Sequence, residues 1–159
     1  DSSADAALVI AAGSAVTETI DARRSFQEAA EVASAAAGQP PRDYFRLPDV
    51  RIRGLLQLLK DDSRLQTYVE RELGPLLRGG ADGAGLLYVL RQYLDAGRNK
   101  SVAADAAQLS RPSFYARLGR IEEALDADLA DAETCLSLHV ALLGLDAVRG
   151  HGSGEAPAR

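Results

Sequence analysis

The sequence predicts a mainly α-helical fold, in which a small helical bundle follows a short α/β segment of strand-helix-strand form. Of the 159 residues, 47% are hydrophobic, which is enough to bury one good core or two small ones. Only 5% are aromatic and the chain has no Trp and no Met, so the core must consist of Leu, Ala, Val and Ile. That composition favours close-packed helices over a β-sandwich. Apolar residues at helical spacing recur along the C-terminal half and place the bundle there.

The α/β segment is predicted from the first 48 residues. Residues 6–13 form a short apolar run that ends at a glycine, which is consistent with a buried strand, although the alanine content leaves a helix open. Residues 22–38 predict a helix with an apolar side that comprises Phe26, Ala29, Ala30, Val32 and Ala33. Residues 43–48 offer a second short strand, which Pro48 restricts to a sheet edge or terminus.

Two amphipathic helices are predicted next, at 50–60 and 63–73. Both are interpreted as linker helices that pack on the domain that follows them. Gly74 and Pro75 are expected to bend the chain, and residues 79–83, which are rich in glycine, are expected to form a flexible connection.

The C-terminal half begins and ends with strongly apolar helices. Residues 86–95 carry an apolar stripe that stops at Gly97, which is expected to act as a C-cap. Residues 132–149 predict the final helix, with Asp131 as its N-cap. Because this last helix has two apolar faces, it is expected to contact both the domain core and a partner. The residues beyond it, 151–159, predict a disordered tail.

Between these helices, residues 101–125 predict a short helix, a tight turn and a longer helix. Ser101 is a suitable N-cap for the first helix, and Ser110 is a suitable N-cap at which the second helix starts. In the longer helix the spacing i, i+4, i+7 and i+11 gives one buried stripe: Phe114, Leu118, Ile121 and Leu125. A two-helix motif also needs a small residue at the crossing and apolar residues on both sides of the turn. Ala104, Leu109 and Phe114 meet this requirement.

Three consecutive stretches resemble the C-terminal helix-turn-helix of the PucR/CdaR family of bacterial transcriptional regulators. They are LLYVLRQYLDAGRN (86–99), LSRPSFYARLGRIEEAL (109–125) and ADLADAETCLSLHVALLGLDAVR (127–149). Many members carry His-Arg-Asn-Thr-Leu at the start of the second helix, where this chain has SRPSF, and Gln108 stands where a glycine is common. The resemblance implies a helix-turn-helix domain over 81–150.

The N-terminal segment, including residues 24–29, is similar to the tail of the degenerate GGDEF-like domain that precedes the DNA-binding domain in many of these regulators. The expected organisation is therefore a partial GGDEF-like segment at 1–48, linker helices at 49–80, the helix-turn-helix domain and the tail. The segment has no glycine-rich phosphate loop and no paired metal-binding carboxylates, so no nucleotide chemistry is expected from it. Because the chain starts at Asp1 without an initiator Met, we expect a fragment whose sensor region lies upstream.

The resemblance implies that the second helix of the motif binds the major groove of double-stranded DNA. Arg111 is the best candidate to read a base, because a guanidinium can bond guanine O6 and N7 together. Ser113, Tyr115 and Ala116 are expected at base edges or a thymine methyl group. The residues expected to contact phosphates are Arg98, Lys100, Arg117 and Arg120. Three residues at the N-termini of the two helices complete the predicted DNA-binding set: Ser101, Ser110 and Pro112.

Charge is distributed in agreement with this prediction. The net charge of −5 argues against indiscriminate nucleic-acid binding, but a global sum hides local fields. Between residues 98 and 120 the only acidic residue is Asp105, against five basic residues. The predicted helix-turn-helix is therefore a basic region in an acidic chain. From spacing alone, solvated arginines on an ordinary helical hairpin remain an alternative of equal weight.

Nothing in the sequence indicates an enzyme. The single cysteine, Cys135, lies on an apolar helix where a buried thiol is usual, and it fits a reducing cytoplasm. His139 is expected to be a satisfied core or interface residue. Two histidines and one cysteine so placed provide no metal-ligand spacing, and no cofactor is expected. No apolar run reaches the length of a membrane span, and neither a membrane span nor a signal peptide is expected.

The sequence thus predicts a cytoplasmic, nucleoid-associated, sequence-specific DNA-binding regulator. A homodimer is expected, with its contact on the final helix and the segments at 50–73, because helix-turn-helix proteins usually bind two half-sites. A small-molecule effector is possible through the missing upstream region. The alternative is a dimerisation or protein-interaction module that keeps the helix-turn-helix fold without binding DNA.

Overall fold

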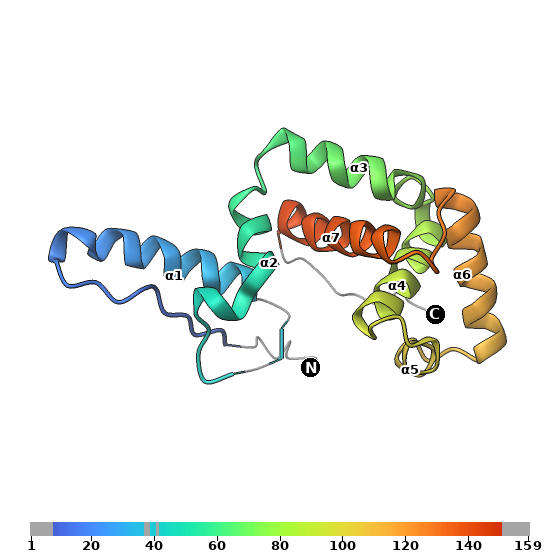
Figure 1. Ribbon diagram of the computed structural model, residues 1–159, viewed down its shortest axis with the longest axis horizontal. Coiled ribbons are helices and arrows are strands. Elements are labelled where there is room, and N and C mark those ends of the chain that lie inside the picture. Colours follow the sequence, from blue (N-terminus) through green and yellow to red (C-terminus); the bar gives the residue numbers. More distant parts are fainter. Residues whose placement is uncertain (1–7, 37–38, 41, 151–159) are drawn as a thin grey trace, which may run out of the picture. The chain divides into compact units, whose positions relative to one another are not determined.

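The computed structural model describes residues 8–36, 39–40 and 42–150, and within them it contains seven α-helices, one short 3-10 helix and no β-strand (Figure 1). The helices are α1 (Ala22–Ala36), α2 (Leu47–Leu58), α3 (Ser63–Leu77), α4 (Gly80–Asp95), α5 (Lys100–Ala106), α6 (Arg111–Leu125) and α7 (Ala132–Arg149). They form two compact units, one from residues up to 65 together with 146–150, and one from residues 66–145. In the described part of the chain, no helix is long and apolar enough to cross a membrane.

The mainly α-helical fold is confirmed for these residues, but the strand-helix-strand segment is wrong. Of the first expected strand, residues 6 and 7 lie outside the described residues, and the rest forms a single parallel bridge from Ala11 to Phe45. Two hydrogen bonds of 2.8 Å hold this bridge, from Ala12 N to Phe45 O and from Phe45 N to Ile10 O. No ladder develops because α2 begins at Leu47, with Pro48 in its first turn, where a missing N–H removes no helical hydrogen bond.

The core of the first unit lies at the C-terminal end of α1. Val32, Ala35 and Ala36 are buried there with Phe45 and Val50. The expected apolar side of this helix is therefore only partly correct, because Phe26 is 79% exposed. The core lies more than a turn beyond Phe26 along α1, so none of the described residues that form it covers this ring. Residues 37 and 38, which contain the predicted helix stop, lie outside the described residues.

The two helices predicted between residues 50 and 73 are both present, but their ends differ from the expectation. α2 is interrupted at Arg51, whose φ of 47° and ψ of −126° are not helical. α3 does not end at Gly74 but continues through Pro75 to Leu77. Pro75 has no N–H to donate to the Arg71 carbonyl, so α3 lacks one i→i−4 hydrogen bond near its C-terminal end.

The glycine-rich connection predicted at 79–83 is the first turn of α4 rather than a flexible linker. Gly80 has a φ of +60°, which a residue without a Cβ adopts at little cost. A Cβ on Gly83 would lie 2.1 Å from the carbonyl oxygen of Leu76, so glycine allows the end of α3 to approach α4 closely. Gly83 therefore serves close packing, whereas Gly80 serves the left-handed backbone turn.

The core of the second unit is built around α4, which packs against α5 and α6. Of the apolar stripe predicted on this helix, Leu86, Leu90, Tyr93 and Leu94 are buried and Leu87 is partly buried, and Val89 is buried as well. The final helix α7 is anchored to α3 by a 2.9 Å hydrogen bond from the Tyr68 hydroxyl to Ser137 O. Of the two apolar faces of α7, the one with Leu138, Leu142 and Leu145 is buried, whereas on the other Leu143 is buried, Val140 is partly buried and Leu136 is 65% exposed.

Candidate nucleic-acid interface

The connection between α4 and α5 is held by a glycine and an asparagine. Gly97 has a φ of +60°, Gly97 N donates to Leu94 O at 3.0 Å, and Arg98 N donates to Tyr93 O at 2.9 Å. This is the Schellman pattern, so the predicted stop at Gly97 is confirmed. The N-cap of α5 is Asn99, whose Oδ1 accepts from Ser101 N and Val102 N at 3.1 and 3.2 Å. The prediction of Ser101 as N-cap is wrong because Asn99 caps the helix two residues earlier.

The turn between α5 and α6 repeats the same geometry with a residue other than glycine. Gln108 has a φ of 54°, Gln108 N donates to Asp105 O, and Leu109 N donates to Ala104 O, both at 3.0 Å. The first helix of the motif therefore ends at Ala106. Ser110 is the N-cap of α6, as predicted, with its Oγ accepting from Ser113 N at 3.3 Å.

We expect Gln108→Gly to raise the free energy of unfolding by about 1 kcal/mol, because a side chain in the left-handed region costs roughly 1–2 kcal/mol and glycine recovers part of it. Urea denaturation followed by circular dichroism measures the change. Gln108→Val is the matched control and should be destabilising, since a β-branched residue is strained at this φ. A valine variant as stable as the parent would contradict the assigned turn.

Helix α6 spans Arg111–Leu125, the range predicted from the sequence. Phe114 and Ile121 are fully buried, Leu118 is 4% exposed and Leu125 is partly buried. Burial of this stripe turns the opposite side of the helix to solvent. The first turns of α6 therefore present a surface of small, polar and basic side chains.

Most residues of the predicted DNA-binding set are exposed, whereas Ser101 and Arg117 are half-buried. The exposed ones are Arg98, Lys100, Ser110, Arg111, Pro112, Ser113, Tyr115, Ala116 and Arg120. Among the described residues, neither Arg111 nor Arg117 takes part in an ion pair. Both guanidinium groups are thus available to an external anion.

Tertiary structure joins Lys100 to Tyr115. The Lys100 ammonium lies over the Tyr115 ring, 5.1 Å from its centroid, and Tyr115 is 50% exposed. Such a cation–π contact contributes about 0.5–1 kcal/mol at an exposed site. The sequence placed both residues in the set but did not predict their contact, which orients the start of α5 beside α6.

Arg120 is held by a residue that the sequence did not single out. Its Nη2 donates to Asp82 Oδ2 on α4, and both side chains are more than half exposed. An exposed pair of this kind contributes only about 0–1 kcal/mol. Asp82 therefore orients Arg120 and offsets its charge without locking it in place.

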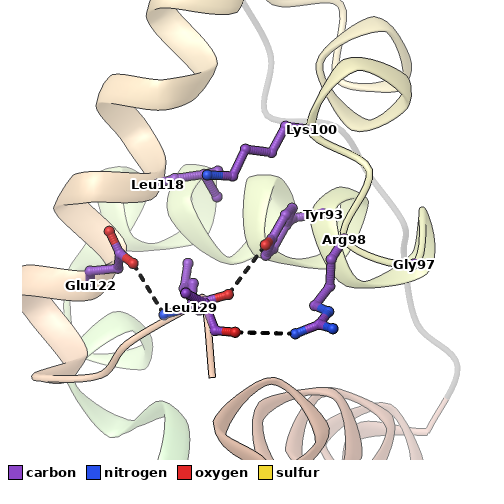
Figure 2. Close-up of a pocket in the computed structure, with 8 residues that line it drawn as sticks. Tyr93, Gly97, Arg98, Lys100, Leu118, Glu122 and Leu129 are labelled. Atoms are coloured by element: carbon purple, nitrogen blue, oxygen red, sulfur yellow. Dashed lines mark hydrogen bonds between the residues drawn. The ribbon is translucent and has the colours of Figure 1, made fainter. Parts of the chain in front are cut away.

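Arg98 lines a cavity of about 450 Å³ between the end of α4, α6 and the turn before α7 (Figure 2). Its Nη1 donates to Ala130 O at 3.4 Å, while the Tyr93 hydroxyl donates to Leu129 O at 3.2 Å. Glu122 Oε1 accepts from Leu129 N at 3.1 Å. Burial raises the pKa of the Tyr93 phenol, which keeps it protonated as a donor. These bonds hold the 126–131 turn, so Arg98 has a structural role as well as its predicted one.

The remaining titratable groups of interest are satisfied within the fold. Cys135 is buried and its Sγ donates to Leu129 O at 3.2 Å, while burial raises the pKa of the thiol. His139 is half-buried, with Nε2 3.1 Å from Asp95 Oδ1. Asp131 caps α7 as predicted, with Oδ2 accepting from Thr134 N at 2.7 Å. Across the described part of the chain, no group of three or more His, Cys, Asp or Glu could hold a metal ion.

Helices α4, α5 and α6, with a tight turn before α6 and an exposed basic first half of α6, define a helix-turn-helix domain. Residues 86–143 match the family model of the PucR C-terminal helix-turn-helix domain. This part of the chain is therefore a PucR-type helix-turn-helix domain, which indicates a DNA-binding transcription regulator. The match does not extend to the N-terminal residues, and a preceding GGDEF-like domain has no support. No curated protein and no solved structure was found to match the chain.

Proposed function

We propose that this chain is a sequence-specific DNA-binding transcriptional regulator that inserts the N-terminal half of α6 into the major groove. The observation that carries the proposal is the exposed, basic start of α6 in a chain of net charge −5. Burial of Phe114, Leu118 and Ile121 on the other side orients that surface outward. A recognition helix binds DNA in this way, with its first turns against base edges.

The positions of the basic residues support a division of roles. Arg111 is the first residue of α6 and has no ion pair among the described residues, so it is proposed to read a base edge. Ser113, Tyr115 and Ala116 complete the base-facing set, together with the helix-start residues Ser110 and Pro112. The residues proposed to contact phosphates are Arg98, Lys100, Arg117 and Arg120, with Ser101 beside them.

The wider organisation follows from this role. We place the DNA-binding domain at 81–150 and the linker helices at 49–80, and the tail at 151–159 lies outside the described residues. The proposal includes no enzymatic activity and no cofactor. A regulator that binds DNA acts where the DNA is, so its proposed location is the bacterial cytoplasm, at the nucleoid.

Salt-dependent binding to duplex DNA tests the proposal. A duplex selected from a random pool is titrated with the chain at roughly 50 to 200 mM salt, and binding is followed by fluorescence anisotropy. With four phosphate-contacting side chains, the plot of log K against log salt concentration should have a slope of about −3 to −4 per chain. If the pool yields no enriched sequence and no duplex binds at low salt, the proposal fails and the chain is an interaction module that retains the fold.

Arg120→Ala should weaken binding to specific and non-specific duplexes by similar factors and reduce the magnitude of the salt slope by about one. The reason is that a phosphate contact adds affinity without sequence information. Asp82→Asn is the matched variant, because it removes the charge that offsets Arg120, and it should strengthen binding to both duplexes. If Arg120→Ala changes the preference between the two duplexes, Arg120 reads a base instead.

A further inference from the structure

We propose that the solvent-facing side of α2 is a self-association surface, which pairs with the same surface of a second copy in antiparallel orientation. This surface lies outside the helix-turn-helix domain, and the argument for it does not depend on DNA binding. We call it the α2 face and define it by Ile52, Leu55, Leu58 and Leu59.

The α2 face groups four large apolar side chains that are all exposed on one short helix. Ile52, Leu55, Leu58 and Leu59 are 41%, 52%, 57% and 37% exposed, whereas Val50, Gly54 and Leu56 on the other side of the helix are buried. At about 100° per residue the four exposed positions fall on one side of the helix. Single exposed leucines need no explanation, but a contiguous group of this kind marks an interaction site.

The spacing of the α2 face is symmetric about Leu55. Ile52 and Leu58 are each three residues from Leu55, so in an antiparallel pair the Ile52 of one copy faces Leu58 of the other, and Leu55 faces Leu55. A two-fold interface requires this self-complementarity, because one patch must fit a copy of itself. The irregular φ and ψ at Arg51 start a new helical segment there, which separates the face from the first turn of α2.

Charge favours the antiparallel orientation over the parallel one. Arg51 is exposed at the N-terminal end of the face, and the exposed Asp61 follows its C-terminal end. Within the described residues neither side chain has an ion pair, whereas Asp62 is already bound by Arg64 at 2.6 Å. Reversing one copy brings Arg51 to the partner's Asp61 and helix C-terminus, where carbonyl groups add partial negative charge. The neighbouring Lys60 weakens this attraction, but the carbonyl groups are unaffected by it.

The size of the α2 face predicts a weak dimer. Four half-exposed side chains provide a few hundred Å² per copy, so the two copies together fall below the roughly 1,200 Å² of a standard stable interface. We therefore expect a dissociation constant in the micromolar range or weaker. Two binding sites on one DNA duplex would raise the effective concentration of a second copy and favour the dimer. The proposal places the dimer contact on α2 rather than on the final helix, because among the described residues of α7 only Leu136 is a large apolar side chain more than half exposed.

Sedimentation velocity of the full chain without DNA, from about 1 to 200 µM, tests the proposal. The parent should shift from monomer towards dimer over this range, and Leu55→Asp should stay monomeric, because two carboxylates would meet at the two-fold axis. Leu136→Asp is the matched control, since Leu136 is a leucine on α7 that is still more exposed than Leu55, at 65% against 52%, and it should associate like the parent. Thermal melting verifies that both variants are folded.

A charge swap tests the orientation. Arg51→Glu and Asp61→Arg should each weaken association by several-fold, and the double variant should restore it, because the pair is re-formed with its signs exchanged. The proposed self-association surface is wrong if the parent remains monomeric at all concentrations. It is also wrong if the Leu55→Asp variant associates like the parent. Loss of association in the double variant overturns the antiparallel pairing. All these measurements omit DNA, so failure of the DNA-binding proposal would leave them unchanged.

Discussion

Phe114→Ala should lower the free energy of unfolding by about 3–5 kcal/mol, the cost of removing a fully buried aromatic ring from a packed core. Phe114 has no exposed surface and lies at the start of α6, the helix that packs on α4. Its loss would leave a cavity under the turns that present the proposed DNA contacts. Urea denaturation followed by circular dichroism measures the effect.

Tyr115→Ala is the control for that experiment. It removes the neighbouring aromatic ring from the same helix, but this ring is half exposed and contacts Lys100 only through an exposed cation–π interaction. The expected loss is therefore below about 1 kcal/mol. Equal losses for the two variants would show that the stripe through Phe114 is not the core of the domain.

Arg111→Ala should weaken binding to the selected duplex by about 1–3 kcal/mol, that is, roughly 10-fold to 100-fold, and relax base preference at one or two positions. The physical reason is that a guanidinium donates two hydrogen bonds to guanine, and the wrong base leaves these donors unpaired. Non-specific binding should fall much less. The measurement compares the selected duplex with a set of single-base variants by competition anisotropy.

Arg117→Ala is the matched variant for Arg111→Ala, because Arg117 lies on the same helix and also has no ion pair among the described residues. As a proposed phosphate contact, it should lower affinity for all duplexes of the set by similar factors. If Arg111→Ala leaves the ranking of the duplexes unchanged, Arg111 does not read a base. If Arg117→Ala changes the ranking, the two roles are exchanged.

Local sequence was sufficient to predict the elements that depend on neighbouring residues. The bounds of α6, the caps at Ser110 and Asp131 and the stop at Gly97 were all predicted, because capping involves atoms within a few positions along the chain. Ser101 was misassigned within the same rules, since Asn99 is an equally good cap and lies earlier. The resemblance of residues 86–99 and 109–149 to one family was supported by the match over 86–143.

The N-terminal strands could not be judged from the sequence, because a strand forms only if a partner provides a ladder. Residues 10–12 pair with Phe45 at a single bridge, and no further strand pairing follows because α2 begins two residues later. The exposure of Phe26 has the same origin, since an apolar side of a helix is buried only where another element covers it. The glycines at 79–83 were predicted to form a flexible connection, because the sequence does not show that the backbone at the end of α3 packs against Gly83.

By itself the sequence determined the helix-turn-helix motif, its buried stripe and the basic character of residues 98–120, because these follow from spacing and composition. Only the tertiary structure decided which charges are free. The partner of Arg120, Asp82, is 38 positions away along the chain, and Arg98 bonds a carbonyl 32 positions away, whereas Arg111 has no ion pair among the described residues. Folding brings these distant groups within hydrogen-bond distance, and an ion pair is set by that three-dimensional proximity rather than by local pattern.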